Sequence, residues 1–146
     1  MVNWSHVLIH HSATPDTPMV ETHGYRKYHT EARGWRDLGY AYVVELAGHD
    51  YAMLAGRPLS WPGAHCRGMN TQSIGICLAG DFSVVPPPIA QQRCAARHVA
   101  ALCDLFNIPT ENIQGHRDYR ATECPGRMFN LEPFRQMVEG YRRAAT

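Results

Sequence analysis

Short apolar segments rich in β-branched and aromatic residues recur along the first half of the chain and constrain its fold most. His6–His10 is one such segment, and Tyr40–Leu46 and Ser73–Leu78 are two more. Apolar runs of about four to eight residues, bounded by Gly, Pro or Ser, are typical of buried β-strands. Tyr51–Leu54 is expected to pair with the second strand across the turn at 47–50, so the first half predicts a sheet.

Helical patterns dominate the second half. Ile89–Phe106 carries apolar residues at helical spacing after a stiff run of three prolines, and Leu131–Arg143 is amphipathic. A further helix is expected at Met19–Ala32, with Gly34 just beyond its end. Strands and helices in this order predict an α/β fold, in which residues 1–146 form a single domain with one central sheet flanked by helices.

Composition excludes several classes of function. The formal net charge of the 146 residues is +1, which gives no electrostatic footprint for nucleic acid. No apolar run approaches the length needed to span a bilayer, so no membrane insertion is expected. The N-terminus lacks the pattern of a signal peptide, which predicts synthesis in the cytoplasm without a leader. A chain of this length can bury a core without metal staples, so any metal is expected to serve chemistry.

Cysteine and histidine usage favours chemistry over cross-linking. Five cysteines are an odd number, which argues against a disulfide framework and for core thiols, one of them used chemically. Nine histidines are many for this length. His10 ends the first predicted strand, and because side chains alternate along a strand, His10 and His11 point to opposite faces.

A second histidine and a cysteine lie in one loop, Gly115–Gly126. His116 and Cys124 are eight positions apart in it. With His10 they would supply three nitrogen and sulfur ligands and leave a fourth zinc position for water, as in catalytic zinc sites. The spacing is not that of a structural zinc motif, however. A packed histidine and a small buried thiol remain alternatives for these residues.

Four stretches together resemble the zinc amidase family that includes the T7-type phage lysozymes and the peptidoglycan recognition proteins. They are VLIHHSAT (7–14), GWRDLGYAYVV (34–44), GAHCRGMNTQSIGICLAGDF (63–82) and GHRDYRATECPG (115–126). The stretches occur in the family's order and span nearly the whole chain. The resemblance implies a mixed sheet with helices around it and a zinc site in a surface groove.

The resemblance also implies roles for individual residues. The family's zinc ligands fall on His10, His116 and Cys124, and its catalytic tyrosine falls on Tyr40, which would hydrogen-bond the attacking water or the developing oxyanion. A second catalytic position falls on Thr122. The T7-type members carry lysine there, whereas catalytic recognition proteins often carry threonine. A hydroxyl donates a hydrogen bond but brings no positive charge.

Substrate contacts are expected around the same groove. His65 falls on a family histidine near the groove, as either a substrate-facing or a structural residue, and Arg67 and Asn70 could contact sugar or peptide. Asp118 is expected to orient His116, because ligating histidines usually donate their second N–H to an oxygen. Two residues are expected to hold the strand of the catalytic tyrosine: Trp35 and Asp37.

The resemblance therefore predicts a zinc-dependent N-acetylmuramoyl-L-alanine amidase, a hydrolase that cuts between the muramic acid lactyl group and L-alanine of bacterial peptidoglycan. A short, leaderless domain of this kind suggests a monomeric phage or prophage endolysin that reaches the cell wall during host lysis, with wall recycling as an alternative role. Two other classes stay open. One is a binding module of the same fold, and the other is a cysteine hydrolase with Cys124 as nucleophile and His116 as base.

Overall fold

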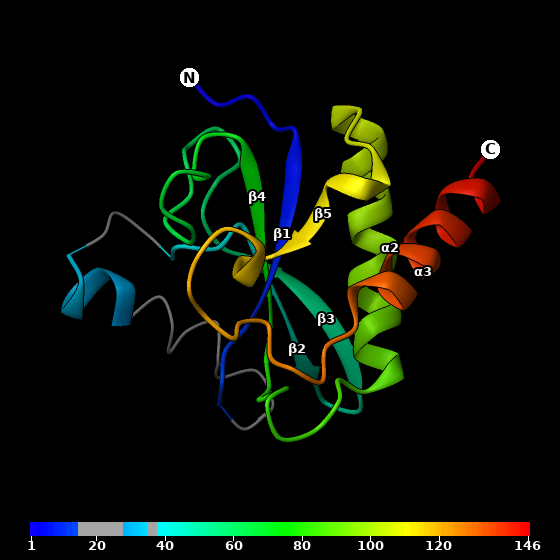
Figure 1. Ribbon diagram of the computed structural model, residues 1–146, viewed down its shortest axis with the longest axis horizontal. Coiled ribbons are helices and arrows are strands. Elements are labelled where there is room, and N and C mark those ends of the chain that lie inside the picture. Colours follow the sequence, from blue (N-terminus) through cyan, green and yellow to red (C-terminus); the bar gives the residue numbers. More distant parts are fainter. Residues whose placement is uncertain (15–27, 35–37) are drawn as a thin grey trace.

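Five strands form one mixed sheet in the computed structural model, which describes residues 1–14, 28–34 and 38–146 (Figure 1). Their order across the sheet is β3-β2-β4-β1-β5. Neighbouring strands run parallel, except that β3 is antiparallel to β2 in a hairpin. The bounds of the strands are His6–His11 for β1, Tyr42–Ala47 for β2, Asp50–Ala55 for β3, Ser73–Leu78 for β4 and Ile113–Gly115 for β5.

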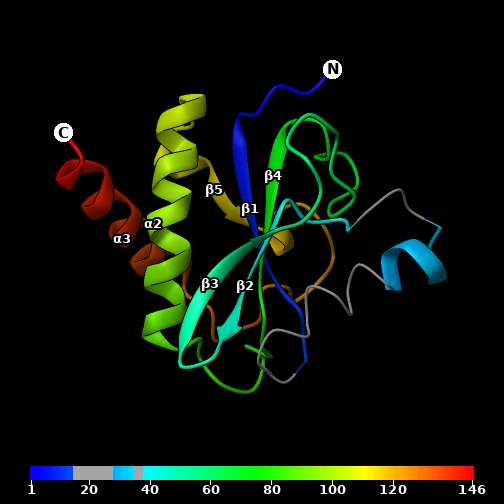
Figure 2. The same ribbon diagram turned by 180° about the vertical axis from the view of Figure 1, so that it is seen from behind.

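Both described α-helices cover the same face of the sheet (Figures 1 and 2). Helix α2 spans Ile89–Phe106 and α3 spans Leu131–Ala144. Helix α2 begins directly after Pro88 and ends at Asn107, whose φ of 55° is left-handed and whose N–H donates to the carbonyl of Cys103. Such a left-handed residue closes a helix because it turns the chain while satisfying a terminal carbonyl. The predicted helix at 89–106 is confirmed.

Alternation along β1 divides the interior in two. Val7 and Ile9 belong to the large core between the sheet and the helices, whereas Leu8 packs on the other face with Cys66 and Met69. Burial of each large apolar side chain contributes about 1.5–3 kcal/mol. The next residue in phase with Leu8 is His10, so the strand's own period turns that histidine away from the helices and towards the loops.

Two polar side chains tie the helices to the rest of the domain. Gln91 of α2 is fully buried, and its amide donates to the carbonyls of Val44 and Ala79, beyond the reach of water. Arg142 of α3 donates to Asp104 of α2 at 2.8 Å and to the carbonyl of Ile108 at 3.2 Å. Both contacts join segments far apart in sequence, so they fix how the helices pack.

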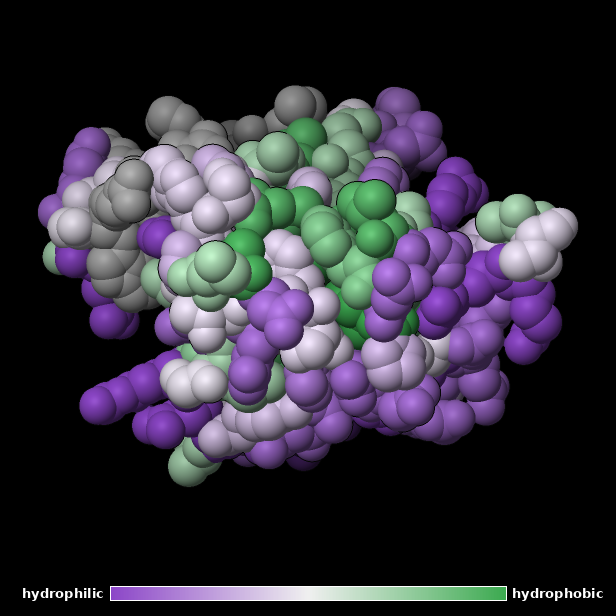
Figure 3. All heavy atoms as spheres, turned by 90° about the horizontal axis from the view of Figure 1, so that it is seen from above, coloured by the Kyte–Doolittle hydropathy of each residue, from purple (hydrophilic) through white to green (hydrophobic). Residues whose placement is uncertain are grey.

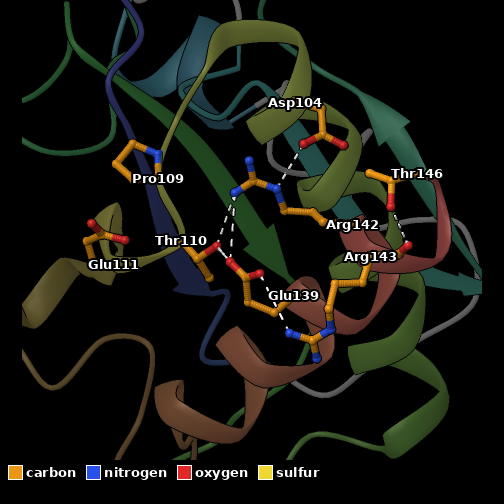
Figure 4. A pocket seen from close by; sticks show the side chains of 8 residues that line it. All are labelled: Asp104, Pro109, Thr110, Glu111, Glu139, Arg142, Arg143 and Thr146. Atoms are coloured by element: carbon orange, nitrogen blue, oxygen red, sulfur yellow. Dashed lines mark hydrogen bonds and ion pairs between the residues drawn. The ribbon is translucent and has the colours of Figure 1, made fainter.

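Arg142 lies in a hollow of about 420 Å³ between α2 and α3 (Figure 4). Glu139 accepts a hydrogen bond from Thr110 there and forms ion pairs with Arg142 and Arg143. Asp104 and Glu139 thus pair with these two arginines of α3, which indicates a structural contact between the helices.

The end of the molecule at which β1 begins presents a mainly polar surface, with apolar side chains gathered near the middle of the view (Figure 3). The candidate site residues lie at the other end of the strands. His10 and His11 close β1, and His116 directly follows β5. Carboxyl ends of adjacent parallel strands meet at one edge of a sheet, which is where α/β proteins commonly place a site. Within the described residues, no helix is long and apolar enough to span a bilayer.

Several predicted boundaries shift. Tyr40 lies in a bend before β2 instead of within the strand, so the strand begins two residues later than the predicted 40–46. Strand β5 was missed because three residues are too few to show a period. Of the predicted helix at 19–32, only Tyr28–Ala32 can be compared, and it forms a π-helical turn. The other residues of that prediction lie outside the described part. All five cysteines are described and are free thiols, as expected.

Candidate active site

His10 lies near the end of β1, the strand between β4 and β5. Its side chain is 1% exposed, and its backbone pairs with Cys77 of β4. The expected division between neighbouring histidines is confirmed. His11 turns to the helix face, where its Nδ1 accepts the backbone N–H of Phe82 at 3.1 Å, and only His10 enters the site.

His116 reaches His10 because β5 is parallel to β1. Gly115 pairs with Ile9, so His116 follows at the level of His10, and their ring centroids lie 4.7 Å apart. His116 begins a 3₁₀ turn over His116–Asp118. Asp118, expected to orient the His116 ring, accepts the backbone N–H of Gly115 at 2.8 Å and so holds the turn.

Cys124 returns to the histidines through a loop that Arg117 closes. The backbone N–H of Arg117 donates to the carbonyl of Cys124 at 2.9 Å. Its guanidinium donates to the carbonyls of Gly126 at 2.7 Å and Phe129 at 3.0 Å. Three hydrogen bonds from one residue thus fix the far end of the loop and deliver the thiol to the site.

The three candidate ligands form a compact set. Ligand atoms of His10, His116 and Cys124 all lie within 4.8 Å of one another, and His10 Nδ1 is 3.6 Å from Cys124 Sγ. Zinc bonds of about 2.05 Å to nitrogen and 2.3 Å to sulfur, at the tetrahedral angle, separate nitrogen and sulfur by about 3.6 Å. The donor atoms and their spacing therefore fit zinc.

Electrostatics keep the three groups uncharged without a cation. Burial lowers the pKa of His10 well below its usual value, assisted by the neighbouring His65 and His116. Burial also lowers the pKa of His116, and it raises the pKa of Cys124 to about 11. Both imidazoles are therefore neutral and able to coordinate at pH 7, whereas the thiol needs a nearby cation to lose its proton.

Tyr40 and Thr122 flank this set. The Tyr40 ring lies against His10, with centroids 5.1 Å apart. Thr122 is half-buried, and its Oγ1 accepts the backbone N–H of Cys124 at 3.2 Å, which leaves its own hydroxyl hydrogen to donate elsewhere. Both residues lie beside the candidate ligands.

A cavity of about 540 Å³ opens beside the ligands and collects the three residues expected to face substrate, His65, Arg67 and Asn70. Arg67 is exposed, whereas the Asn70 side chain accepts the backbone N–H groups of His65 at 2.9 Å and Cys66 at 3.0 Å. His65 also turns inward to the second nitrogen of His10. Trp35 and Asp37 lie outside the described residues.

Arg120 is the cavity residue that sequence reasoning missed. It is exposed and lines the same cavity as His116 and Thr122. Its place in the sequence between His116 and Cys124 was a usable signal, because the short segment joining two candidate ligands stays near the site. Among the described residues, the cavity lining contains two arginines and no carboxylate side chain.

Fold and site together define an α/β domain with a preformed histidine–histidine–cysteine set beside a polar cavity. Residues 2–127 match the sequence profile of the N-acetylmuramoyl-L-alanine amidase family. The chain belongs to this family.

Relatives include phage endolysins and recognition proteins. The endolysin of Klebsiella phage KP32 is 35% identical over 131 residues, covering 88% of this chain and 83% of the relative. Peptidoglycan-recognition protein LB of Drosophila melanogaster is 36% identical over 134 residues, covering 85% of this chain and 56% of the relative. The chain spans 22% of the pig N-acetylmuramoyl-L-alanine amidase, to which it is 31% identical over 134 residues, or 84% of this chain.

Solved structures share the fold. Drosophila PGRP-LB superposes with a TM-score of 0.77 at 32% identity, covering 88% of this chain and 79% of that one. The amidase LysC of Clostridium intestinale superposes with a TM-score of 0.81 at 24% identity, covering 94% and 87%. The predicted single α/β fold with a mixed central sheet and its resemblance to this family are confirmed.

Proposed function

We propose that this protein is a zinc-dependent amidase that hydrolyses the amide between the muramic acid lactyl group and L-alanine of peptidoglycan. The observation that carries the proposal is the set of His10, His116 and Cys124, whose spacing fits tetrahedral zinc and which borders a cavity of about 540 Å³. Zinc held there supplies a Lewis acid that lowers the pKa of water and polarises an amide carbonyl.

The chain's own residues supply orientation and charge stabilisation. Tyr40, beside His10, would donate its hydroxyl hydrogen to the oxygen on which negative charge develops, and Thr122 would donate from the loop that carries His116 and Cys124. Arg67 and Asn70 would bind sugar or peptide along the cavity, together with the exposed Arg120. Because both arginines are cationic, the cavity favours a substrate portion that carries carboxylates.

Family membership favours peptidoglycan as the substrate of this protein. The role we propose for the protein is that of a phage or prophage endolysin. Support comes from two phage relatives, the endolysins of Klebsiella phage KP32 and Enterobacteria phage K11. The chain covers 83% of the length of each. A Drosophila PGRP-LB variant was solved with tracheal cytotoxin, and that chain is 30% identical to this one with a TM-score of 0.79. The protein would act as a monomer on the cell wall, reached during lysis.

Two rival functions make different demands on Cys124. A binding-only module of this fold has no need of the cysteine ligand, so the presence of Cys124 beside both histidines favours the enzyme. A cysteine hydrolase needs a thiolate in the absence of metal. Burial raises the pKa of Cys124 to about 11, which keeps the thiol protonated and argues against a nucleophile.

The test is release of soluble stem peptide with a free N-terminal alanine from purified peptidoglycan. The protein is assayed untreated, after EDTA, and after zinc is restored, with Cys124→Ser alongside. Cys94→Ser is the matched control, because that half-buried thiol lies on α2 and contacts the carbonyl of Tyr51. We expect activity to vanish with EDTA and in Cys124→Ser only. Folded, zinc-loaded protein that releases nothing from several wall types would leave the binding module as the better account.

A further inference from the structure

The nitrogen of His10 that faces away from the metal position meets a second histidine. His10 Nε2 lies 2.9 Å from His65 Nδ1, with the two rings nearly perpendicular. On its far side, His65 Nε2 lies 3.1 Å from the backbone carbonyl oxygen of Ser73. The contacts form a chain from a β4 carbonyl through two imidazoles to the nitrogen that faces Cys124.

The direction of every hydrogen bond in this chain follows from its last acceptor. A carbonyl oxygen only accepts, so His65 Nε2 must carry a hydrogen and donate it to Ser73. In the neutral ring that burial favours, His65 Nδ1 then has a lone pair and must accept from His10 Nε2. His10 consequently carries its hydrogen on Nε2, and Nδ1 presents a lone pair towards Cys124.

The His65 ring cannot readily turn away from this arrangement, because two glycines enclose it. A Cβ placed on Gly75 of β4 would lie 2.6 Å from His65 Cγ, and one on Gly63 would lie 2.5 Å from His65 Cδ2. The backbone of His65 is fixed as well, since its N–H donates to the Asn70 side chain at 2.9 Å. The ring is thus held by close packing against both glycines and by hydrogen bonds at both nitrogens.

We propose that His65 is a positioning residue that fixes the tautomer and orientation of His10 before any metal binds, in addition to lining the cavity. The inference rests on the zinc site of the proposed function. A histidine ligand binds more tightly when its second nitrogen is held by an acceptor, and loss of such a partner typically weakens metal binding about 10- to 100-fold. His65 therefore contributes to zinc affinity without coordinating the ion.

Substitutions at position 65 separate hydrogen bonding from packing. His65→Leu fills space without an acceptor, whereas His65→Asn is smaller but places an amide oxygen near the position of Nδ1. His98→Leu is the control, because His98 is an exposed histidine of α2. Zinc affinity is measured by chelator competition, and urea unfolding of the zinc-free proteins reports on the fold.

We expect zinc binding to weaken about 10- to 100-fold in His65→Leu and by less than about tenfold in His65→Asn, with His98→Leu unchanged. A His65→Leu affinity within about twofold of the parent overturns the inference. So does an affinity in His65→Asn as low as or lower than in His65→Leu, because packing alone would then account for the effect.

A second measurement needs no variant. Nitrogen-15 NMR of the imidazole rings in the metal-free protein should find the His10 hydrogen on Nε2 and protected from exchange with water. A hydrogen on Nδ1 would overturn the inference even if every variant at position 65 unfolded. If the parent protein binds no zinc, the proposed function fails, whereas zinc binding with an Nδ1 hydrogen on metal-free His10 defeats the positioning role alone.

Discussion

Gly75→Ala adds one methyl group to the centre of β4 and tests the enclosure of His65 directly. The new Cβ would lie 2.6 Å from Cγ, 2.7 Å from Cδ2 and 2.9 Å from Nδ1 of that ring. Carbon atoms in contact sit about 3.5–4.0 Å apart, so the ring must move by roughly 1 Å. Gly63 also lies against the ring, and the hydrogen bonds to His10 and Ser73 oppose its displacement.

The cost follows from these contacts. Overpacking a filled interior destabilises a protein by about 1–3 kcal/mol. Displacing the ring also weakens the bonds at its two nitrogens, each worth about 1 kcal/mol net. Gly75→Ala should therefore lower the free energy of unfolding of the zinc-free protein by about 2–4 kcal/mol, and zinc affinity should fall in the same variant.

Urea unfolding measures the first effect and chelator competition the second. Gly140→Ala provides the matched control, because Gly140 is an exposed residue within α3 with nothing within 4 Å of an added Cβ. The same chemical change there should stabilise the protein by up to about 1 kcal/mol through helix propensity. A stability change below about 0.5 kcal/mol for Gly75→Ala, with zinc affinity unaltered, would refute the enclosure.

Three further outcomes are expected. Tyr40→Phe should lower kcat for stem-peptide release by about 10²–10³-fold while zinc content, measured by atomic absorption, stays at that of the parent. Burial lowers the pKa of His65 to about 4. As the pH falls below about 6.5, this imidazole therefore binds a proton in the unfolded chain but stays neutral in the folded one. The zinc-free protein should lose about 3 kcal/mol of stability through this residue between pH 6.5 and 4. The urea midpoints of His65→Leu should lack this part of the dependence of stability on pH. Arg142→Ala removes the contacts to Asp104 and to the Ile108 carbonyl and should cost about 1–2 kcal/mol in urea unfolding. A loss of zinc affinity in Arg142→Ala, in addition to the loss of stability, would contradict a purely structural role for Arg142 between the helices.

Elements with strong local signals could be predicted from sequence. Helix α2 was located to the residue because Pro88 prevents an earlier start and Asn107 takes the left-handed conformation that ends it. Strands β1 and β4 each contain a short apolar run, and both are largely buried in the sheet. Strand β5 has only three residues, and its pairing with β1 depends on tertiary contacts that no local pattern records.

The site divides in the same way. His10, His116 and Cys124 could be proposed as a set from ligand chemistry and family motifs, and they do lie together. The contact of His65 with His10 could not be predicted. It depends on Gly63 and Gly75, whose missing side chains leave space for the His65 ring only once the loop has folded over β4. A glycine inside a β-strand often marks a close approach of another group, and that was the available signal.

Register explains why the histidines meet at all. Ile9 lies beside Gly115, so His10 and His116 fall side by side where both strands end, and a slip of one residue would bring His11 to the site instead. Gly115 has no side chain, which lets the Cys124–Pro125 segment pack close to the strand. A Cβ at this position would lie 3.0 Å from Pro125 Cδ. The helices and sheet bury their core without recourse to these residues. The ligand set is therefore a consequence of a fold stabilised elsewhere, so a metal held there would serve chemistry and not the stability of the fold.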